Sequence, residues 1–415
     1  MKILIYGLNY APEPVGIGKY SGELGTWLAS RGHRVRVIAA PPYFPQWDAF
    51  DNRYRRESRN GVEIWRCPLW VPRQPNGLTR LVHLASFALS SLPVLLAQRC
   101  WKPEVIICIA PALFCAPGAL LLRLTCGPRT LAWLHIQDFE LDAAFGLGLL
   151  KGDRVRQWAT RWERRTLQGF GRVSAISEAM RLHAIAKGVA KPKTYLLQNW
   201  VDLDTIQPQP ATQREHNPYR KELELSPETL VLLYSGSMNK KQGLDLLVEV
   251  IKKLQTHKNL TWVLAGDGPG QPAVAKALKH LEQVRVLPLQ PSERMNDWLN
   301  LADIHLLPQK EGAADLVLPS KLLGILASGR PVVATSPPGS TLGVFAEQAG
   351  IRVDPNDLKG FARALNKLIS NRSLREHLGI QARRLAEANF GKEQILQSFE
   401  KQLLTHQFNL SQKPN

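Results

Sequence analysis

The chain has 415 residues, of which 44% are hydrophobic, so it holds enough apolar material for two packed domains and is not a disordered protein. Its five cysteines form no CxxC pair and no metal-ligand spacing, which excludes a zinc module and favours a reducing compartment. The formal net charge of +18 favours an anionic partner, namely nucleotide-sugar phosphates, a lipid leaflet or nucleic acid.

The first apolar run, residues 2–6, passes within a few residues into a glycine-containing loop. We therefore interpret it as a buried strand rather than a secretory signal, and we expect a cytoplasmic protein. Helical stretches separate it from further apolar strands, which we expect at residues 35–39, 105–109 and 130–134. This alternation of strand and helix predicts a parallel sheet.

A polar segment with two prolines, residues 199–213, predicts a linker between domains. The alternation then resumes, with strands expected at residues 230–235, 260–265, 284–287, 304–307 and 331–335, and a charged amphipathic helix follows over 370–405. We predict an α/β protein with two Rossmann-like domains that face each other across a cleft. The expected boundaries are 1–205, 206–390, and a final helix and tail, 391–415, that brace the first domain.

Two segments of the first half suggest a membrane. Residues 81–98 form the most apolar window, which fits a buried or half-buried helix, a helix lying on a membrane, or a true span. Residues 151–165 are basic and place Trp158 and Trp162 four residues apart on one helix face. Such a helix either lies on anionic lipid or is a solvated face with its tryptophans in the core.

The loop after the first strand contains Gly16, Gly18 and Gly22, which allow a ligand to approach the backbone closely at a helix start. A dinucleotide site would have GxGxxG directly after the strand and an acidic residue at the end of the second strand. Here the glycines follow the pattern GxGxxxG and arrive ten residues late, and no acidic residue ends the second strand. These departures argue against NAD.

Polar residues follow the strand expected at 130–134. His135 would lie at the carboxyl end of that strand, where it either contacts a sugar or acts as an acid or base, or has a structural role. Asp138 lies just beyond it and Asn199 closes the first domain, and we expect both to line the cleft. The carboxylate spacing here is too common to predict a metal, and we expect none.

The turn after the strand at 230–235 contains Gly236, Ser237, Asn239, Lys240 and Lys241. Backbone N–H groups and two point charges suit a diphosphate, although a solvated turn has the same composition.

Residues 317–335 indicate a short helix joined by Gly329 to a buried strand. Ser320 is the expected N-cap, and Lys321 places a cation beside the free N–H groups of the helix start. A diphosphate would suit this position as well.

The runs VGIGKYSGEL, HIQDFELDAAFGLG, YSGSMNKKQGLD and VLPSKLLGILASGRPVVAT together resemble the family 4 glycosyltransferases, which have the GT-B fold. The resemblance implies retaining, metal-independent transfer of a sugar from a GDP- or UDP-linked donor, with fucose from GDP-fucose expected. It further implies a lipid-linked saccharide acceptor in exopolysaccharide assembly of the colanic-acid type. The enzyme would contact the anionic inner face of the plasma membrane, need no cofactor and bind no nucleic acid.

In this resemblance Gly16 and Gly18 map near the donor phosphate, and His135 maps to the cleft histidine. We expect Lys321, Lys241 and His135 to be catalytic. The family's paired glutamates, however, fall at Leu316 and Gly324, and the second of them normally holds the ribose. Two alternatives therefore stay open: a nucleotide-sugar epimerase of the same fold, or a non-catalytic basic protein that binds membrane or nucleic acid.

Overall fold

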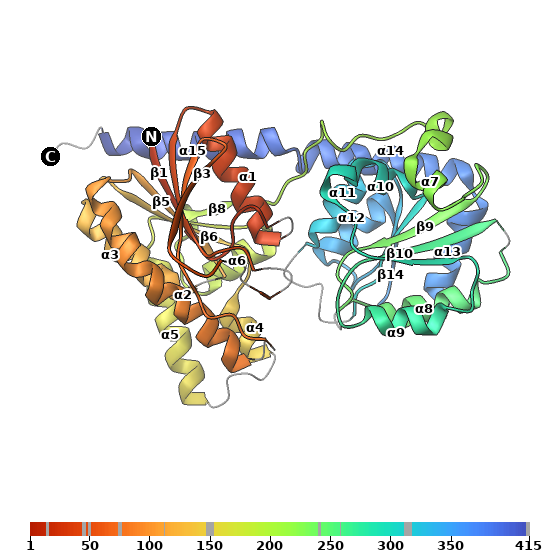
Figure 1. Ribbon diagram of the computed structural model, residues 1–415, viewed down its shortest axis with the longest axis horizontal. Helices are drawn as coiled ribbons and strands as arrows, with labels where there is room; N and C mark the ends of the chain where they lie inside the picture. Colours follow the sequence, from red (N-terminus) through yellow and green to blue (C-terminus); the bar gives the residue numbers. More distant parts are fainter. Residues whose placement is uncertain are drawn as a thin grey trace. The chain divides into compact units, whose positions relative to one another are not determined.

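The computed structural model divides the chain into two compact units, one formed by residues 1–199 and 395–415 and the other by residues 200–394. Each unit is a parallel sheet covered by helices (Figure 1). The structure describes residues 1–13, 16–43, 47–48, 51–73, 77–111, 113–146, 153–239, 242–257, 259–310 and 318–411.

The first unit has an eight-stranded sheet in the order β3-β4-β2-β1-β5-β6-β7-β8. All neighbouring strands are parallel except β3, which pairs antiparallel with β4 at one edge. The central strands are buried along nearly their whole length, as their continuous apolar sequences predict. The bounds are β1 Lys2–Gly7, β2 Arg34–Ala39, β3 Arg55–Arg59, β4 Val62–Arg66, β5 Val105–Ala110, β6 Leu131–Ile136, β7 Arg172–Ala175 and β8 Thr194–Leu196.

Helices cover this sheet. Their bounds are α1 Gly16–Ser30, α2 Gly77–Ala97, α3 Ala116–Cys126, α4 Glu140–Gly146, α5 Asp153–Gly169, α6 Glu178–Ala186 and α15 Lys392–Ser411. The C-terminal helix α15 packs on the first unit, where the Phe399 ring meets the edge of Trp133 at 4.9 Å between centroids. Glu400 on the same helix contacts His33 Nε2 at 2.8 Å. Helix α15 thus completes the first domain.

The second unit has a six-stranded parallel sheet in the order β11-β10-β9-β12-β13-β14. Its strands are β9 Leu230–Ser235, β10 Leu260–Ala265, β11 Val284–Leu287, β12 Ile304–Leu307, β13 Val332–Thr335 and β14 Gly350–Val353. Its helices are α7 Pro218–Glu222, α8 Leu244–Lys253, α9 Gln271–Leu278, α10 Met295–Leu301, α11 Ser320–Ala327, α12 Thr341–Ala349, α13 Leu358–Ser370 and α14 Arg372–Asn389. Apolar clusters fill both sides of the sheet.

Four of the five strands expected in the second half have the observed bounds, and the fifth begins one residue late, at Val332. Gly329 adopts a positive φ of 64° just after α11, as its predicted role in ending the helix requires. In the first half the bounds expected for the strand at 130–134 were wrong. This strand continues through His135 and Ile136, because both residues are buried and pair with β5.

Candidate functional site

In the second unit the strand order reverses between β9 and β12. Open parallel sheets bind ligands beyond the carboxyl ends of their strands at such a point. Three segments meet there: the turn at Gly236 after β9, the residues around Gln309 after β12, and the start of α11. We call this set the second-unit edge site.

The turn after β9 rests on the neighbouring turn after β10. Gly236 N donates to the Ala265 carbonyl (2.9 Å), and Met238 N donates to the Asp267 carbonyl (2.7 Å). A Cβ atom on Gly266 would lie 1.9 Å from the Gly236 carbonyl oxygen. The second turn therefore requires glycine in order to support the first.

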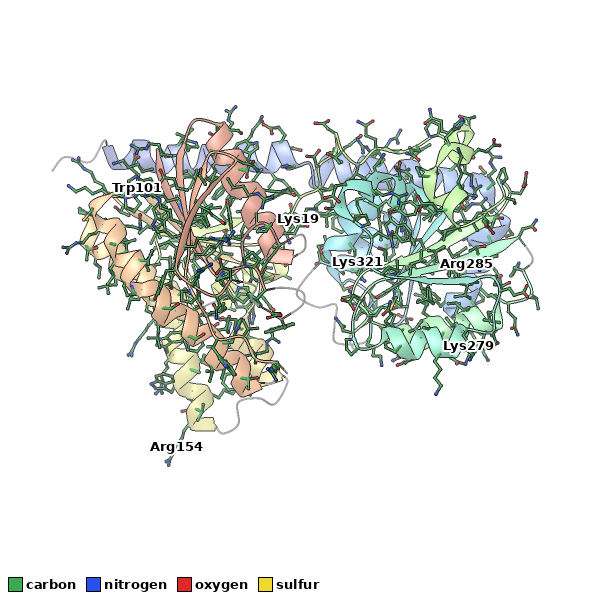
Figure 2. All side chains as sticks on the ribbon, viewed as in Figure 1. Lys19, Trp101, Arg154, Lys279, Arg285 and Lys321 are labelled. Atoms are coloured by element: carbon green, nitrogen blue, oxygen red, sulfur yellow. The ribbon has the colours of Figure 1, made fainter. Side chains whose placement is uncertain are left out.

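Lys321, the second residue of α11, carries the main charge of this site (Figure 2). Its Nζ donates to Gln242 Oε1 (3.0 Å) and to the Tyr234 hydroxyl (3.4 Å), and it lies 4.6 Å from the centroid of the Tyr234 ring. Among the described residues it forms no ion pair with a carboxylate, and burial lowers the pKa of Lys321 to about 8. A desolvated ammonium group with neutral partners favours an incoming anion.

The prediction that Ser320 caps α11 was wrong. The helix begins at Ser320, and Pro319 occupies the N-cap position in extended conformation with no side-chain hydrogen bond. Leu322 N donates to the Pro319 carbonyl (2.9 Å), and within the described part of the chain no side chain caps this helix, so its start keeps its first N–H groups and the positive dipole end that suit an anion.

Two buried side-chain atoms at the same edge have no hydrogen-bond partner among the residues that the structure describes: Gln309 Oε1, two residues after β12, and Ser336 Oγ, directly after β13. The Thr335 hydroxyl joins these loops, since it accepts from Gln309 N (2.6 Å) and donates to the Gln309 carbonyl (2.7 Å). Buried polar atoms are normally paired, so a bound polar ligand would complete this edge. Sequence reasoning did not select Ser336.

The other expected donor residues lie around the turn after β9. Ser237 is exposed, and its Oγ accepts from Asn239 Nδ2 (3.3 Å). Lys240 and Lys241 lie outside the described residues. Gln242 is the hydrogen-bond partner of Lys321.

The first unit has its own reversal of strand order, between β1 and β5. Gly16 begins α1 with a φ of 61°, and a Cβ atom there would meet nothing within 4 Å. On Gly18 it would lie 2.5 Å from Glu13 Oε2, so the glycine makes room for this buried carboxylate. Glu13 accepts from Asn9 Nδ2 (2.9 Å) and from Tyr43 N (3.3 Å).

His135 is 3% exposed and lies inside β6. Its Nδ1 is 2.9 Å from Ser174 Oγ, which also accepts from Trp133 Nε1 (2.8 Å), and its Nε2 is 3.3 Å from Gln137 Nε2. Burial lowers the pKa of His135 to about 3, so the imidazole is neutral at physiological pH. Any contact of His135 with a sugar would therefore come from an uncharged ring.

Three polar residues near the carboxyl end of β6 and the end of the first unit differ in environment. Asp138 is exposed, whereas Asn199 Oδ1 is buried without a partner. Glu140, which was not singled out as a site residue, accepts from Leu113 N (2.7 Å) through Oε2, and its Oε1 is buried and unpaired. Burial, together with the nearby Asp138 charge, raises the pKa of Glu140 to about 7.

An aromatic cluster near Glu13 was also missed. The rings of Tyr43, Trp47 and His83 lie 4.9 to 5.7 Å apart, and Trp47 has a φ of 55°, a backbone conformation that is rare for a tryptophan. The His83 Nε2 atom is buried without a partner. No group of three or more metal-ligating side chains occurs in the described part of the chain.

The sequence matches two family models in succession. Residues 15–200 match a glycosyl transferase 4-like domain, and residues 229–371 match the glycosyl transferases group 1. The chain is 42% identical over 411 residues to a protein of Escherichia coli (strain K12) that is assigned to colanic acid biosynthesis as the glycosyl transferase WcaI. That match covers 96% of this chain and 98% of the E. coli protein.

Solved structures agree on the fold. Sucrose-phosphate synthase from Thermosynechococcus elongatus matches with a TM-score of 0.75 at 16% identity, over 99% of this chain and 100% of that one. Anabaena HepE in complex with UDP-glucose matches with a TM-score of 0.69 at 15% identity, over 98% of this chain and 100% of that one. At these identities the similarity concerns the fold, which is GT-B.

Proposed function

The chain belongs to the GT-B glycosyltransferases that join a glycosyl transferase 4-like domain to a group 1 domain, and we propose that it transfers a sugar from a nucleotide-diphosphate donor to a lipid-linked saccharide with retention. The donor diphosphate binds at the second-unit edge site. The first unit, which carries the glycine loop at Gly16 and the aromatic cluster of Tyr43, Trp47 and His83, supplies the acceptor site.

The observation that carries this proposal is the uncompensated charge of Lys321. Its ammonium group is desolvated, has only neutral partners among the described residues, and lies beside a helix start that no side chain caps. A diphosphate would supply the missing negative charge to both features at once. Gln309 Oε1 and Ser336 Oγ are free to accept hydrogen bonds from hydroxyl groups of the donor.

The chemistry requires stabilisation of the leaving group. The bond between C1 of the sugar and the phosphate oxygen breaks, and its electron pair leaves with the diphosphate while the sugar becomes oxocarbenium-like. Lys321 and the α11 N–H groups oppose the charge that develops on the departing oxygen. Because cations of the protein can stabilise the negative charge of the leaving diphosphate, the proposed reaction requires no metal.

Retention follows if the acceptor hydroxyl attacks the face that the diphosphate leaves. The new bond then joins the acceptor oxygen to C1, and the hydroxyl proton passes to the departing phosphate oxygen. The neutral His135 cannot supply a positive charge to this step, so its role in the proposal is to orient the donor sugar.

Two relatives guide the choice of substrates. The E. coli relative is assigned to colanic acid biosynthesis, and HepE was crystallised with UDP-glucose. We propose a GDP-linked sugar, GDP-fucose first, as the donor, a UDP-sugar as the second choice, and a lipid-diphosphate-linked saccharide of exopolysaccharide assembly as the acceptor.

The first experiment measures thermal stabilisation by GDP, UDP, ADP and dTDP, because a ligand of the folded state raises the Tm in proportion to the logarithm of its concentration over Kd. Selective stabilisation by GDP identifies the base, and stabilisation by UDP alone would replace GDP-fucose with a UDP-sugar. The chosen nucleotide sugar is then incubated with membrane lipid extract, and the anomeric configuration of the product is determined by NMR.

The variants Lys321→Met and Lys279→Met each remove one positive charge, the first at the proposed donor site and the second away from it. Their comparison distinguishes a specific role of Lys321 from an effect of net charge. Lys279 is exposed at the end of α9 and points into solvent (Figure 2). We expect Lys321→Met to reduce kcat/KM by on the order of a hundredfold, and Lys279→Met to leave it unchanged. Equal activity of both variants would remove Lys321 from the site, and donor consumption without any acceptor would favour an epimerase.

A further inference from the structure

The helix α2 has two different faces. One face packs into the first unit: Phe87 lies 6.0 Å from the Tyr6 ring, and the Ser91 hydroxyl forms a 2.7 Å hydrogen bond with the Tyr6 hydroxyl. Phe87, Ser91 and Leu95 are fully buried at spacings of four residues, which is one stripe of the helix. The hydrogen bond from this stripe to the sheet means that α2 belongs to the folded domain and is not a free membrane span.

The opposite face of α2 is apolar and exposed. Leu89 is 72% exposed and Val82 is 48% exposed, and they lie seven residues apart on the same side of the helix. Residues Thr79–Cys100 form the one described segment that is long and apolar enough to cross a membrane, yet only 28% of its most apolar window is buried. A helix of a water-soluble domain normally turns its polar face outward, so this face lacks its partner.

The exposed apolar surface continues onto α3. A Cβ atom on Gly118 would lie 3.0 Å from Leu95 of α2, so the two helices pack closely. On the outer side of α3, Leu124 is 70% exposed and Leu121 is 44% exposed. Helices α2 and α3 lie side by side (Figure 1), and both carry exposed leucines.

Helix α5 is the third helix of this exposed surface. Its Trp162 packs against Phe114 at the start of α3, with ring centroids 6.0 Å apart, whereas Trp158 is 68% exposed. The sequence left open whether these two tryptophans face lipid or the core; the structure leaves Trp158 exposed and Trp162 half-buried.

The charge on this layer is almost entirely positive. Helices α2 and α3 contain no acidic residue, and α5 contains two: Asp153, its first residue, and the buried Glu163, which is paired with Lys187. The exposed arginines of the three helices are Arg80, Arg154, Arg156, Arg161, Arg164 and Arg165. Figure 2 shows Arg154 projecting outward from the first turn of α5.

We propose that the outer layer of α2, α3 and α5 docks on an anionic lipid bilayer, with Leu89, Leu124 and Trp158 inserted at the interface. Apolar side chains bordered by arginines are what an interfacial protein surface requires, because burial of the leucines and attraction to anionic headgroups act together. A second copy of the chain is a poor partner for this layer. A two-fold contact would place the α5 arginines of one copy against those of the other, and like charges repel.

This proposal deepens the proposed function, because it would bring the first unit to the surface where a lipid-linked acceptor lies. It does not depend on transfer activity, and its test uses binding alone. The surface presented by the cytoplasmic leaflet of a plasma membrane has the required negative charge.

The test is flotation of the full chain with vesicles of phosphatidylcholine alone or with 30% phosphatidylglycerol, about a third of the lipid, at two salt concentrations. We expect binding only to the anionic vesicles, weakened by salt. The double variant Leu89→Glu/Leu124→Glu should bind at least about tenfold more weakly, because two apolar contacts become repulsive. The milder Arg154→Gln/Arg161→Gln should reduce both the affinity and its salt dependence.

The control is Ile380→Glu, which changes a 55% exposed isoleucine on α14 of the second unit and should bind as the unchanged chain does. Nucleotide-induced stabilisation should be retained in all variants, so a loss of folding or of the donor site would be seen separately. Failure to float with anionic vesicles would overturn the proposal. So would equal binding by Leu89→Glu/Leu124→Glu, or a dimer that those substitutions dissociate.

Discussion

The ammonium group of Lys321 lies directly above the backbone of Gly236: a Cβ atom at position 236 would lie 2.9 Å from Nζ and 3.0 Å from Cε. Gly236 also has a φ of 137°, where side chains are rarely tolerated. The turn after β9 and the cation of α11 therefore pack closely against each other. The observed position of Lys321 requires glycine at position 236.

Gly236→Ala should weaken nucleotide binding by about tenfold or more, since the new methyl group pushes Lys321 away from the turn and strains the backbone. Isothermal titration with the stabilising nucleotide measures the loss. Gly339→Ala is a matched control, because Gly339 also has a positive φ, of 73°, but a Cβ atom there meets nothing within 4 Å. If Gly236→Ala binds nucleotide as tightly as Gly339→Ala does, Lys321 does not need its observed position.

Nucleotide affinity should fall as the pH rises through the pKa of Lys321. The free protein has this pKa at about 8, whereas the nucleotide phosphates are already fully ionised above pH 7. Binding requires the charged lysine, so Kd should increase about tenfold between pH 7 and pH 9 and binding should take up a proton. Lys321→Arg should abolish this dependence, because arginine stays charged. An identical pH profile in Lys321→Arg would assign the effect to another group.

The stability of the free protein should respond to the same group with the opposite sign. The pKa of Lys321 is lowered from its ordinary value of 10.5, so between about pH 8 and pH 10.5 the unfolded chain binds more protons than the folded one. This group alone therefore makes the folded state more stable as the pH rises through that window. The two opposite trends separate a titrating Lys321 from general alkaline unfolding.

Local sequence signals were sufficient where a residue acts through its own neighbours in the chain. The apolar run at 230–235 and Gly329 at a helix end have their predicted structure, and Ser177 shows the same local dependence, since as the N-cap of α6 its Oγ accepts from Met180 N (3.1 Å). These features depend on φ values, on burial of a continuous strand, and on hydrogen bonds over three residues.

Sequence signals failed where contacts between residues far apart in the chain determine the structure. The pair of Gln309 and Ser336 becomes a candidate site only because β12 and β13 are neighbours that leave two buried atoms unpaired. In the sequence Glu140 looks like any acidic residue. It becomes a candidate only in the fold, where it is buried and accepts a hydrogen bond from Leu113 N, 27 residues away. Likewise the antiparallel pair β3 and β4 was not predicted, because the polar sequence of β3 carries no apolar pattern.

The resemblance described above aligns Gly324 with a glutamate, and we expect that placing glutamate there would not create a ribose contact. A Cβ atom on Gly324 would lie 3.1 Å from Leu299 Cδ1, a buried residue of α10, so a side chain there starts toward the core. Gly324→Glu should lower the Tm by several degrees through overpacking and a desolvated charge, without a gain in nucleotide affinity. Gly324→Ala is the control, because it shows the effect of replacing glycine and adding a Cβ atom without the carboxylate. Tighter nucleotide binding by Gly324→Glu would contradict this account.

Arg66 links three segments of the first unit at the carboxyl edge of its sheet. Its guanidinium is 1% exposed and donates to the Ala40 carbonyl (2.9 Å), to the Ala11 carbonyl and to Glu57 (2.9 Å). Arg66→Lys keeps the charge but has one donor nitrogen in place of the planar fork, so at least one buried carbonyl loses its partner. We expect a loss of about 2 to 4 kcal/mol in the free energy of unfolding of this unit, measured by urea denaturation.

Arg56→Lys is the matched control for Arg66→Lys, because Arg56 is 62% exposed and pairs with Glu63 at the sheet edge, where such pairs contribute little. Its free energy of unfolding should change by less than about 0.5 kcal/mol. Since Ala11 and Ala40 lie in the loops that carry Glu13 and Tyr43, Arg66→Lys should also raise the KM for the acceptor while leaving the nucleotide Kd unchanged. A variant as stable as Arg56→Lys would mean that water replaces the lost hydrogen bonds, and that the loops after β1 and β2 keep their positions without this arginine.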